Sequence, residues 1–161
     1  MNNEISLGTW LSLYSEAIAE VLVNAGYEWV TVDLEHSAIT IDQAEKLIRV
    51  IDLAGAKPYV RVSSNDAVQI KRVLDAGAQG IIVPMVNTKD DVLAAISAMN
   101  YPPLGSRGMG LARAQGYGEA NLKSKYIEKS SKELELYIQI ESKDALDNLD
   151  DIFSQNIDGY M

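Results

Sequence analysis

The sequence of 161 residues contains no cysteine, one phenylalanine and one histidine. Without cysteine there is no disulfide, no thiolate nucleophile and no zinc site with sulfur ligands. No apolar run approaches the roughly 18 residues of a membrane span, and Met1–Glu4 lacks the basic residues of a signal peptide. We therefore expect a cytoplasmic protein that has no membrane partner.

Positive charge is also scarce, because 14 Lys and Arg residues stand against 23 Asp and Glu residues, a net charge of −9. This balance argues against a nucleic-acid partner, since phosphate neutralisation requires a surface rich in Lys and Arg. It also repels anionic small molecules at long range, so an acidic substrate would need a local cation. The length predicts one domain over residues 1–161. The pattern of strands and helices described next indicates that it is an α/β domain.

A repeated pattern of helix, Ala-Gly and strand runs along the chain. Ala25-Gly26, Ala54-Gly55 and Ala76-Gly77 each end a helix-like stretch, and a short apolar strand follows each of them. Glycine just past a helix C-terminus supplies the left-handed backbone that ends the helix. Thr40 and Gln43 form the pattern of a capping box at the start of the second helix. Strands that alternate with helices over short connections predict a parallel sheet.

The expected elements are given by their residue ranges. Strands are expected at Leu7–Leu11, Trp29–Glu35, Tyr59–Ser63, Ile81–Val86 and Leu136–Glu141, and helices at Ser15–Ala25, Thr40–Ala54, Asp66–Ala76, Thr88–Asn100 and Asp144–Gln155. The final residues, "DGYM", are expected to open a seventh strand.

In three of these strands polar and apolar residues alternate, so that each strand has one polar face. The polar faces carry Thr31, Asp33 and Glu35 on one strand, Tyr59, Arg61 and Ser63 on the next, and Tyr137, Gln139 and Glu141 on the third. If helices cover the apolar faces, the polar faces converge inside a barrel, whose C-terminal rim carries the chemistry in (β/α)8 folds. A half-exposed antiparallel sheet is the alternative, and the Ala-Gly pattern favours the barrel.

The single histidine, His36, lies at the end of a predicted strand, three residues after Asp33. A lone histidine is more often structural than catalytic, but Asp33 precedes this one and Arg61 stands at the matching end of the next strand. These three residues are therefore candidates for a catalytic group. Glu35 is either a solvated carboxylate or a supporting partner, and Trp10 either walls the pocket or packs in the core.

Six short motifs follow one another from Leu7 to Met161: "GTW", "DLEH", "VRV", "LDAGAQGIIVPMV", "YPPLGSRGMG" and "QIES". Together they resemble the metal-dependent (class II) 2-keto-3-deoxy acid aldolases of the HpcH/HpaI family. The resemblance implies a TIM (β/α)8 barrel, here incomplete at about six βα units. It also implies reversible cleavage of a 2-keto-4-hydroxy acid, such as 2,4-dihydroxyhept-2-ene-1,7-dioate or a 2-keto-3-deoxy sugar acid, to pyruvate and an aldehyde. Citrate-lyase-type C–C lyases belong to the same superfamily.

The resemblance also implies roles for individual residues. Glu141 would be a ligand of a divalent metal, for which Mg²⁺ or Mn²⁺ is expected and Co²⁺ is a third candidate. Arg61 would bind the substrate and stabilise the negative charge of an enolate. His36, oriented by Asp33, would be the general base for the C4 hydroxyl. Gln139 and Trp10 would contact the substrate, and the protein would be a homo-oligomer.

Two further sequence features bear on this interpretation. A class I aldolase needs a lysine at a strand end for a Schiff base, and none is expected there, which favours metal-assisted chemistry. "GSRGMG" is not a dinucleotide fingerprint, and we expect a loop with unusual backbone angles.

The length departs from the family pattern, because a (β/α)8 barrel takes about 250 residues. The family's Gly-Pro-x-Asp-Leu-Ser stretch, whose Asp is a second metal carboxylate, is absent from residues 1–161. We therefore expect the C-terminal part of the domain to be missing. The chain is then either a piece of an aldolase or a catalytically inactive partial barrel that associates with another chain.

Overall fold

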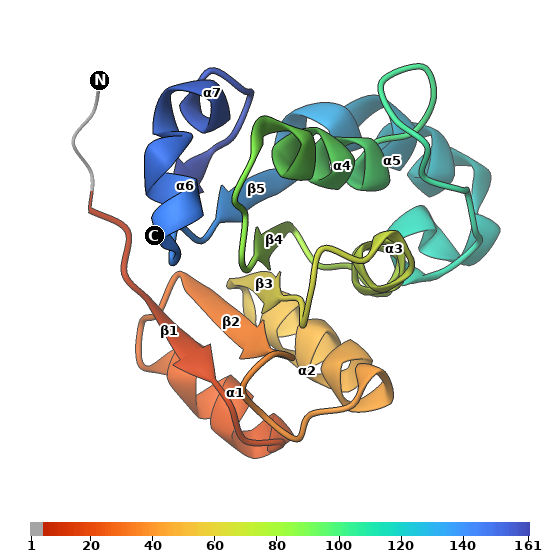
Figure 1. Cartoon of the computed structure of the whole chain (residues 1–161). Coiled ribbons are helices and arrows are strands. Elements are labelled where there is room, and N and C mark those ends of the chain that lie inside the picture. Colours follow the sequence, from red (N-terminus) through yellow and green to blue (C-terminus); the bar gives the residue numbers. More distant parts are fainter. Residues whose placement is uncertain (1–4) are drawn as a thin grey trace.

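The fold is a single parallel sheet, which the computed structural model describes for residues 5–161, apart from the side chain of residue 120. Within this range six strands pair in the order of the sequence: β1 (Gly8–Leu11), β2 (Trp29–Asp33), β3 (Lys57–Arg61), β4 (Gly80–Val83), β5 (Glu135–Ile138) and β6 (Gly159–Tyr160). Every neighbouring pair is parallel, which rules out the antiparallel alternative. The sheet curls into half a barrel, and its edge strands β1 and β6 border the open side (Figure 1).

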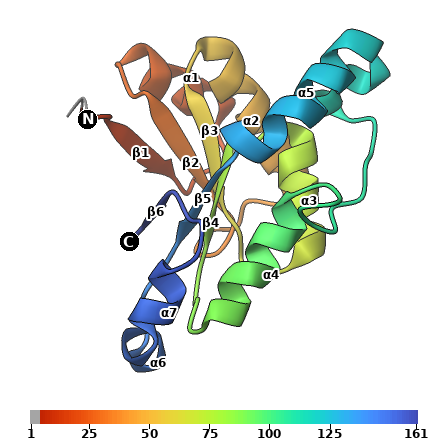
Figure 2. The same cartoon turned by 90° about the horizontal axis from the view of Figure 1, so that it is seen from above.

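Helices follow the strands and pack on the convex side of the sheet (Figures 1 and 2). They are α1 (Glu16–Asn24), α2 (Ile41–Ala54), α3 (Ala67–Ala76), α4 (Lys89–Met99), α5 (Ala120–Glu133), α6 (Lys143–Asp147) and α7 (Leu149–Phe153), with a short 3₁₀ segment η1 (Arg113–Gly118) before α5. None of the helices in residues 5–161 is long and apolar enough to cross a membrane.

The predicted helix ends are confirmed by their local geometry. The Thr40 side chain accepts a hydrogen bond from the Gln43 backbone N–H, and the Gln43 side chain accepts one from the Thr40 N–H. Gly55 and Gly77 end α2 and α3 in the left-handed region, at φ of 106° and 108°. Each strand after such a glycine therefore begins close to the end of the helix before it.

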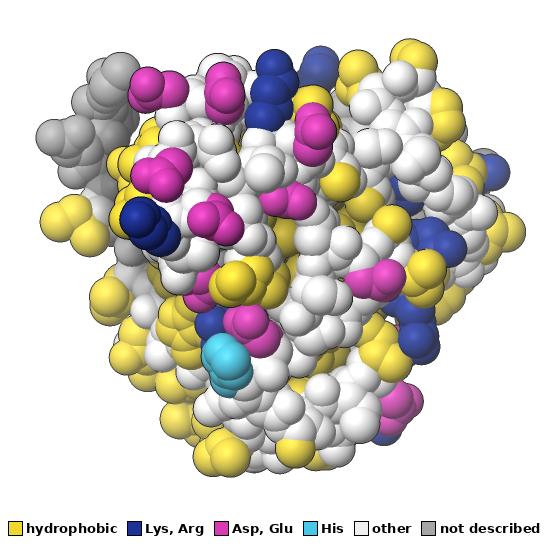
Figure 3. All heavy atoms as spheres, in the orientation of Figure 1, with side chains coloured by type: hydrophobic (Ala, Val, Ile, Leu, Met, Phe, Trp, Pro, Cys, Tyr) yellow, Lys and Arg dark blue, Asp and Glu magenta, His cyan; other side chains and the backbone are white. Residues whose placement is uncertain are grey.

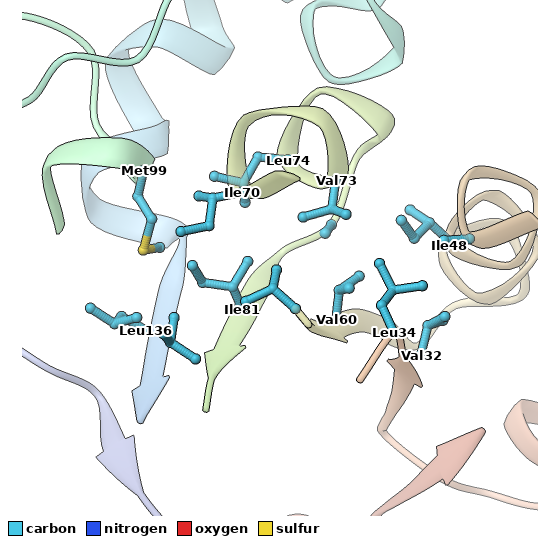
Figure 4. Packing of buried hydrophobic residues seen from close by; sticks show 14 of the residues in the cluster. Val32, Leu34, Ile48, Val60, Ile70, Val73, Leu74, Ile81, Met99 and Leu136 are labelled. Atoms are coloured by element: carbon cyan, nitrogen blue, oxygen red, sulfur yellow. The ribbon is translucent and has the colours of Figure 1, made fainter. Parts of the chain in front are cut away.

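The hydrophobic core lies between the convex face of the sheet and its helices. Figure 4 shows Val32, Val60, Ile81 and Leu136 of the strands facing Ile48, Ile70, Val73, Leu74 and Met99 of α2, α3 and α4. Full burial of one such side chain contributes about 1.5–3 kcal/mol. This apolar layer takes one face of the strands β1 to β5 and leaves the other face, where Thr31 and Asp33 lie, turned into the barrel.

Three expectations about the elements are corrected by the structure. Residues 159–160 form the sixth strand of the described chain, not a seventh. The helix expected at Asp144–Gln155 is two short helices, broken at Asn148, whose side-chain amide donates to the carbonyl oxygens of Asn87 and Asp144. Helix α5, for which the sequence pattern predicts no element, carries mostly polar residues.

The loop that contains "GSRGMG" also differs from its prediction, because Gly105, Gly108 and Gly110 are not among the residues at positive φ. Gly105 is needed for space, since a Cβ there would lie 2.4 Å from the carbonyl oxygen of Ser97. The fully buried Arg107 side chain fastens this loop by hydrogen bonds to Asp75 (2.7 Å) and to the Tyr126 hydroxyl (2.9 Å).

Candidate active site

The centre of the candidate site is an ion pair between adjacent strand ends. Asp33 closes β2 and Arg61 closes β3, and the two residues are register partners in the sheet. The Asp33 carboxylate accepts hydrogen bonds from Arg61 Nε (2.8 Å) and Nη2 (2.6 Å), a bidentate arrangement. Asp33 is 4% exposed. Burial raises the pKa of Asp33, but the hydrogen bonds from Arg61 and from backbone N–H groups outweigh it and hold the pKa below its usual value.

The third nitrogen of Arg61 faces the interior of the site. Nη1 lies 3.5 Å from Gln139 Oε1 and 3.2 Å from Glu35 Oε2. The latter contact is close but not aligned as a hydrogen bond, so that Glu35 Oε2 is buried without a hydrogen-bond donor among the described residues. Asp33 therefore fixes the guanidinium by one edge, while Nη1 and a carboxylate oxygen of Glu35 retain unused hydrogen-bonding capacity.

The structure places His36 at the rim but does not orient its ring through Asp33. The Asp33 carboxylate accepts from the backbone N–H groups of Glu35 (3.0 Å) and His36 (3.3 Å), which fixes the turn after β2. The imidazole is 72% exposed, and its Nε2 lies 3.7 Å from Glu35 Oε2. Figure 3 shows the single histidine on the surface beside acidic and basic side chains. Asp33 thus positions the backbone of His36, while Glu35 is the carboxylate nearest its ring.

Glu141 follows β5 and is held from the neighbouring strand end. Its Oε1 accepts a hydrogen bond from the Met85 backbone N–H (2.7 Å). Met85 has φ of 52°, in the left-handed region that a non-glycine residue rarely adopts. Glu141 also contributes to raising the pKa of Arg61, after the larger effects of Asp33 and Glu35, so its charge acts on the same guanidinium.

Trp10 covers the guanidinium from the edge strand β1. The centre of the Arg61 guanidinium lies 4.7 Å from the ring centroid, which is a cation–π contact, and Trp10 remains 39% exposed. Trp10 therefore packs on a site residue and also presents a free surface at the rim.

A layer of aromatic residues closes the barrel below the site. The rings of Trp29 and Tyr59 stack at 5.7 Å, and those of Tyr59 and Tyr137 meet at 5.6 Å. Both tyrosine hydroxyls donate to Glu135, at 2.6 and 2.5 Å, and Lys57 donates to the other oxygen of that carboxylate. Burial and the Glu135 carboxylate raise the pKa of Tyr137 to about 12. This layer gives the site a floor, so that a ligand enters from the strand ends.

Comparison with known proteins shows the family to which this chain belongs. A sequence model described as HpcH/HpaI aldolase/citrate lyase matches residues 6–160. The chain belongs to this family. Among curated relatives, it is 38% identical to a hydroxypyruvate/pyruvate aldolase of Sagittula stellata over 96% of the chain. It is also 38% identical to a 2-keto-3-deoxy-L-rhamnonate aldolase of Klebsiella pneumoniae, over 100% of this chain.

Solved structures of the HpcH/HpaI family superpose closely on this chain. A family protein from Burkholderia cenocepacia gives a TM-score of 0.90 at 31% identity, over 98% of this chain and 63% of that one. The structure described as citrate synthase SbnG gives 0.86 at 29% identity, over 99% and 61%. The chain also spans about 60% of the two aldolases named above, 61% and 60% respectively. It is therefore part of a TIM-barrel fold, and six strands account for the part described.

The oxygen atoms at the rim fit a hard divalent cation only in part. Residues 5–161 contain no group of three His, Cys, Asp or Glu side chains placed to hold a metal. Glu141 offers one carboxylate oxygen beyond the one bound to Met85, and Glu35 Oε2 lacks a donor. Mg²⁺ typically keeps several water ligands and takes one or two carboxylates together with substrate oxygens, so Glu141 would supply one of its protein ligands.

The structure thus brings together five of the six residues singled out from the sequence: Asp33, Arg61, Gln139, Glu141 and Trp10. His36 lies at the same rim with its ring turned to solvent. Glu35, left open from the sequence, contacts both Arg61 and His36. Its place on the polar face of the strand predicted at Trp29–Glu35 was the available signal. The structure also shows two exposed lysines near the strand ends, which the predicted strand positions did not indicate. They are Lys89 and Lys143, the first residues of α4 and α6.

Proposed function

We propose that the protein carrying this chain is an aldolase that reversibly cleaves a 2-keto-4-hydroxy acid to pyruvate and an aldehyde. The observation that carries the proposal is Arg61, a cation fixed by Asp33 at the strand ends with Nη1 turned into the site. Aldolases among its curated relatives support the same reaction class. The 2-keto-3-deoxy sugar acids are the substrate class that we favour.

Cleavage requires a base at the C4 hydroxyl and a cation at the C2 oxygen. His36 takes the hydroxyl proton and the C3–C4 bond breaks, which releases the aldehyde. The electron pair of that bond forms the C2–C3 double bond of an enolate, whose negative charge lies on the C2 oxygen. Arg61 Nη1 stabilises the charge on the enolate oxygen, and protonation at C3 then gives pyruvate. The imidazole is open to water, and its Nε2 lies 3.7 Å from Glu35 Oε2.

Glu141 is the residue that would hold a divalent cation, Mg²⁺, Mn²⁺ or Co²⁺, which when bound would polarise the keto group as a Lewis acid. Met85 fixes this carboxylate before any ligand arrives. Gln139 and Trp10 border Arg61 and would orient the keto acid. Three expectations from the sequence stay predictions: that the protein is a homo-oligomer, that it lies in the cytoplasm, and that the domain continues beyond residue 161.

The proposal is tested by a coupled assay of pyruvate release from 4-hydroxy-2-keto acids, with the protein at the length of its aldolase relatives. We expect activity that disappears in EDTA and returns with Mg²⁺ or Mn²⁺. Full activity in EDTA, or covalent trapping of pyruvate by borohydride on Lys89 or Lys143, would show a Schiff-base enzyme instead.

The resemblance to a citrate synthase structure supports a second candidate, a carbon–carbon lyase that acts on citrate-like acids. This candidate predicts release of a tricarboxylate-derived keto acid and no cleavage of 4-hydroxy-2-keto acids. The same assay with both substrate classes separates the two activities.

A further inference from the structure

A second concave site lies at the opposite end of the strands from Arg61. The cavity, of about 590 Å³, is open to solvent and is lined by α5, by η1 and by the residues that join α3 to β4, Gly77–Gln79. Its volume is within the range of small-molecule sites, about 300–1,000 Å³. Because Gly77–Gln79 precede β4, a ligand here would not touch the residues at the strand ends. No residue of the edge strands β1 and β6 lines this cavity. In both cartoon views α3 and α5 lie far from β1 (Figures 1 and 2).

The charge around this cavity is reversed relative to the rest of the chain. Helix α5 contains four lysines and two glutamates within a chain of net charge −9, and basic side chains gather along the right edge of the surface in Figure 3. The cavity is lined by Arg113, Lys125 and Lys129 and by two carboxylates, Asp52 and Glu133. Arg113 pairs with Asp52, and Lys129 pairs with Glu133 at 3.0 Å. Three cations against two carboxylates leave one positive charge for a ligand.

Two of these lysines converge on the cavity from one helix face. Lys125 and Lys129 are four residues apart on α5, so their side chains are neighbours. Both are exposed, and the Lys129–Glu133 pair is an exposed ion pair, which contributes little stability and can be exchanged. An anionic group between the two ammonium groups would form charge-assisted hydrogen bonds.

On the aromatic side of the cavity, Tyr117 has a backbone conformation that glycine adopts more easily. Gly116, Tyr117 and Gly118 have φ of 59°, 52° and 92°, three consecutive residues in the left-handed region. Tyr117 is the only one of the three that is not glycine. It lines the cavity and is 68% exposed. Strained residues of this kind concentrate at ligand sites. Tyr126, on α5, adds a second ring to the lining.

We propose that this cavity binds a small molecule with a planar ring and a phosphate group, the chemistry of a nucleoside monophosphate. Tyr117 stacks on the ring, and Lys125 and Lys129 bind the phosphate. The site is independent of the proposed aldolase reaction, since it shares no residue with the strand-end group.

Equilibrium dialysis with AMP, adenosine and inorganic phosphate tests the proposal and tolerates self-association of the chain. We expect AMP to bind more tightly than adenosine or phosphate alone. We also expect its affinity to fall as salt is added. Lys125→Ala/Lys129→Ala should weaken AMP binding by about tenfold or more, because two charge-assisted contacts are lost. The matched control is Lys123→Ala/Lys132→Ala, which removes the same charge from α5 at positions that do not line the cavity, and it should retain affinity within about twofold.

Tyr117→Gly tests the ring separately. Glycine accepts the positive φ, so this variant should fold, keep its affinity for phosphate and lose the advantage of AMP over phosphate. The proposal is wrong if AMP shows no saturable binding, if the control pair weakens it as much as Lys125→Ala/Lys129→Ala, or if Tyr117→Gly leaves the AMP preference intact. A change of oligomeric state in Lys125→Ala/Lys129→Ala without a change in AMP binding would identify the cavity as a contact between copies and also overturn it.

Discussion

At the scale of single residues, the Asp33–Arg61 pair sets the electrostatics of the candidate site. One edge of the guanidinium is bound by the carboxylate, and the stacked ring of Trp10 covers its face. The Arg61 side chain is 13% exposed, so its charge is weakly screened and acts strongly on a nearby oxyanion. The same pair therefore affects both turnover and stability.

The kinetic prediction rests on the proposed aldolase reaction. Arg61→Ala should lower kcat by about 10²–10³, the effect of losing one oxyanion donor, and His36→Ala by about 10²–10⁴, the range for a general base. Arg49→Ala, at an exposed position on α2 paired with Glu45, is the matched control and should change little. Steady-state pyruvate release checks all three. Near wild-type turnover in Arg61→Ala or His36→Ala would remove that residue from the mechanism.

The stability prediction concerns Asp33, whose folded pKa is lowered by Arg61 and backbone N–H groups despite its burial. Its ionised form stabilises the fold above the unfolded pKa of about 3.9, and this contribution is lost as pH falls through the lower folded pKa. Asp33→Asn should reduce the free energy of unfolding at pH 7 by about 3 kcal/mol, because Arg61 loses a buried partner. It should also flatten the loss of stability below about pH 4. Urea unfolding across pH measures both, and an unchanged acid limb would contradict the second.

At the scale of elements, the two ends of the strands have different tasks. The C-terminal ends carry the ion pairs of the site, whereas the aromatic layer of Trp29, Tyr59 and Tyr137 fills the barrel near the N-terminal ends around the Glu135 carboxylate. Burial raises the pKa of Glu135, but hydrogen bonds from Lys57 and the two tyrosines outweigh this, so it stays ionised as their acceptor. The layer therefore ties β3 to β5 by side chains as well as by the sheet.

The layer predicts a loss of stability at alkaline pH. The folded pKa of Tyr137 is about 12, above the unfolded value of about 10. The contribution of Tyr137 to the free energy of unfolding is therefore complete below about pH 10. It is lost as pH rises from there through the folded pKa. Tyr137→Phe should show a weaker alkaline decline in urea unfolding than wild type. Tyr160→Phe, at a position 64% exposed, serves as the control. A decline in Tyr137→Phe as steep as in wild type would mean that other groups cause it.

At the scale of the whole molecule, the curled sheet has two uncovered edges. β1 and β6 lie at the ends of the strand order, and large apolar side chains beside them are exposed, including Leu7 (58%), Phe153 (39%) and Tyr160 (64%). Unpaired strand edges beside apolar surface favour pairing with another chain.

We therefore predict that the 161-residue chain, made alone, associates or aggregates and shows little or no aldolase activity. Size-exclusion chromatography with light scattering and the pyruvate assay measure the two parts. A well-behaved monomer with metal-dependent turnover would refute the prediction and would show that the rim described here holds its cation without a second carboxylate.

The sequence by itself determined the features that depend on neighbours along the chain. Thr40 with Gln43, and the glycines at 55 and 77, predicted helix ends because capping involves residues within one helical turn. Alternation along β2, β3 and β5 predicted which side chains face the interior, because successive residues of a strand point to opposite faces. The strand-end residues could therefore be identified, and their family roles stay predictions.

Only the tertiary structure decided which of those residues touch. Asp33 holds Arg61 28 positions away, and Met85 holds Glu141 56 positions away, because strand order and register place these ends side by side. The same packing turned the His36 ring toward Glu35 and formed α5, whose residues are mostly polar. Contacts between distant residues arise when elements bury their apolar faces together, and a local sequence pattern contains no information about that arrangement.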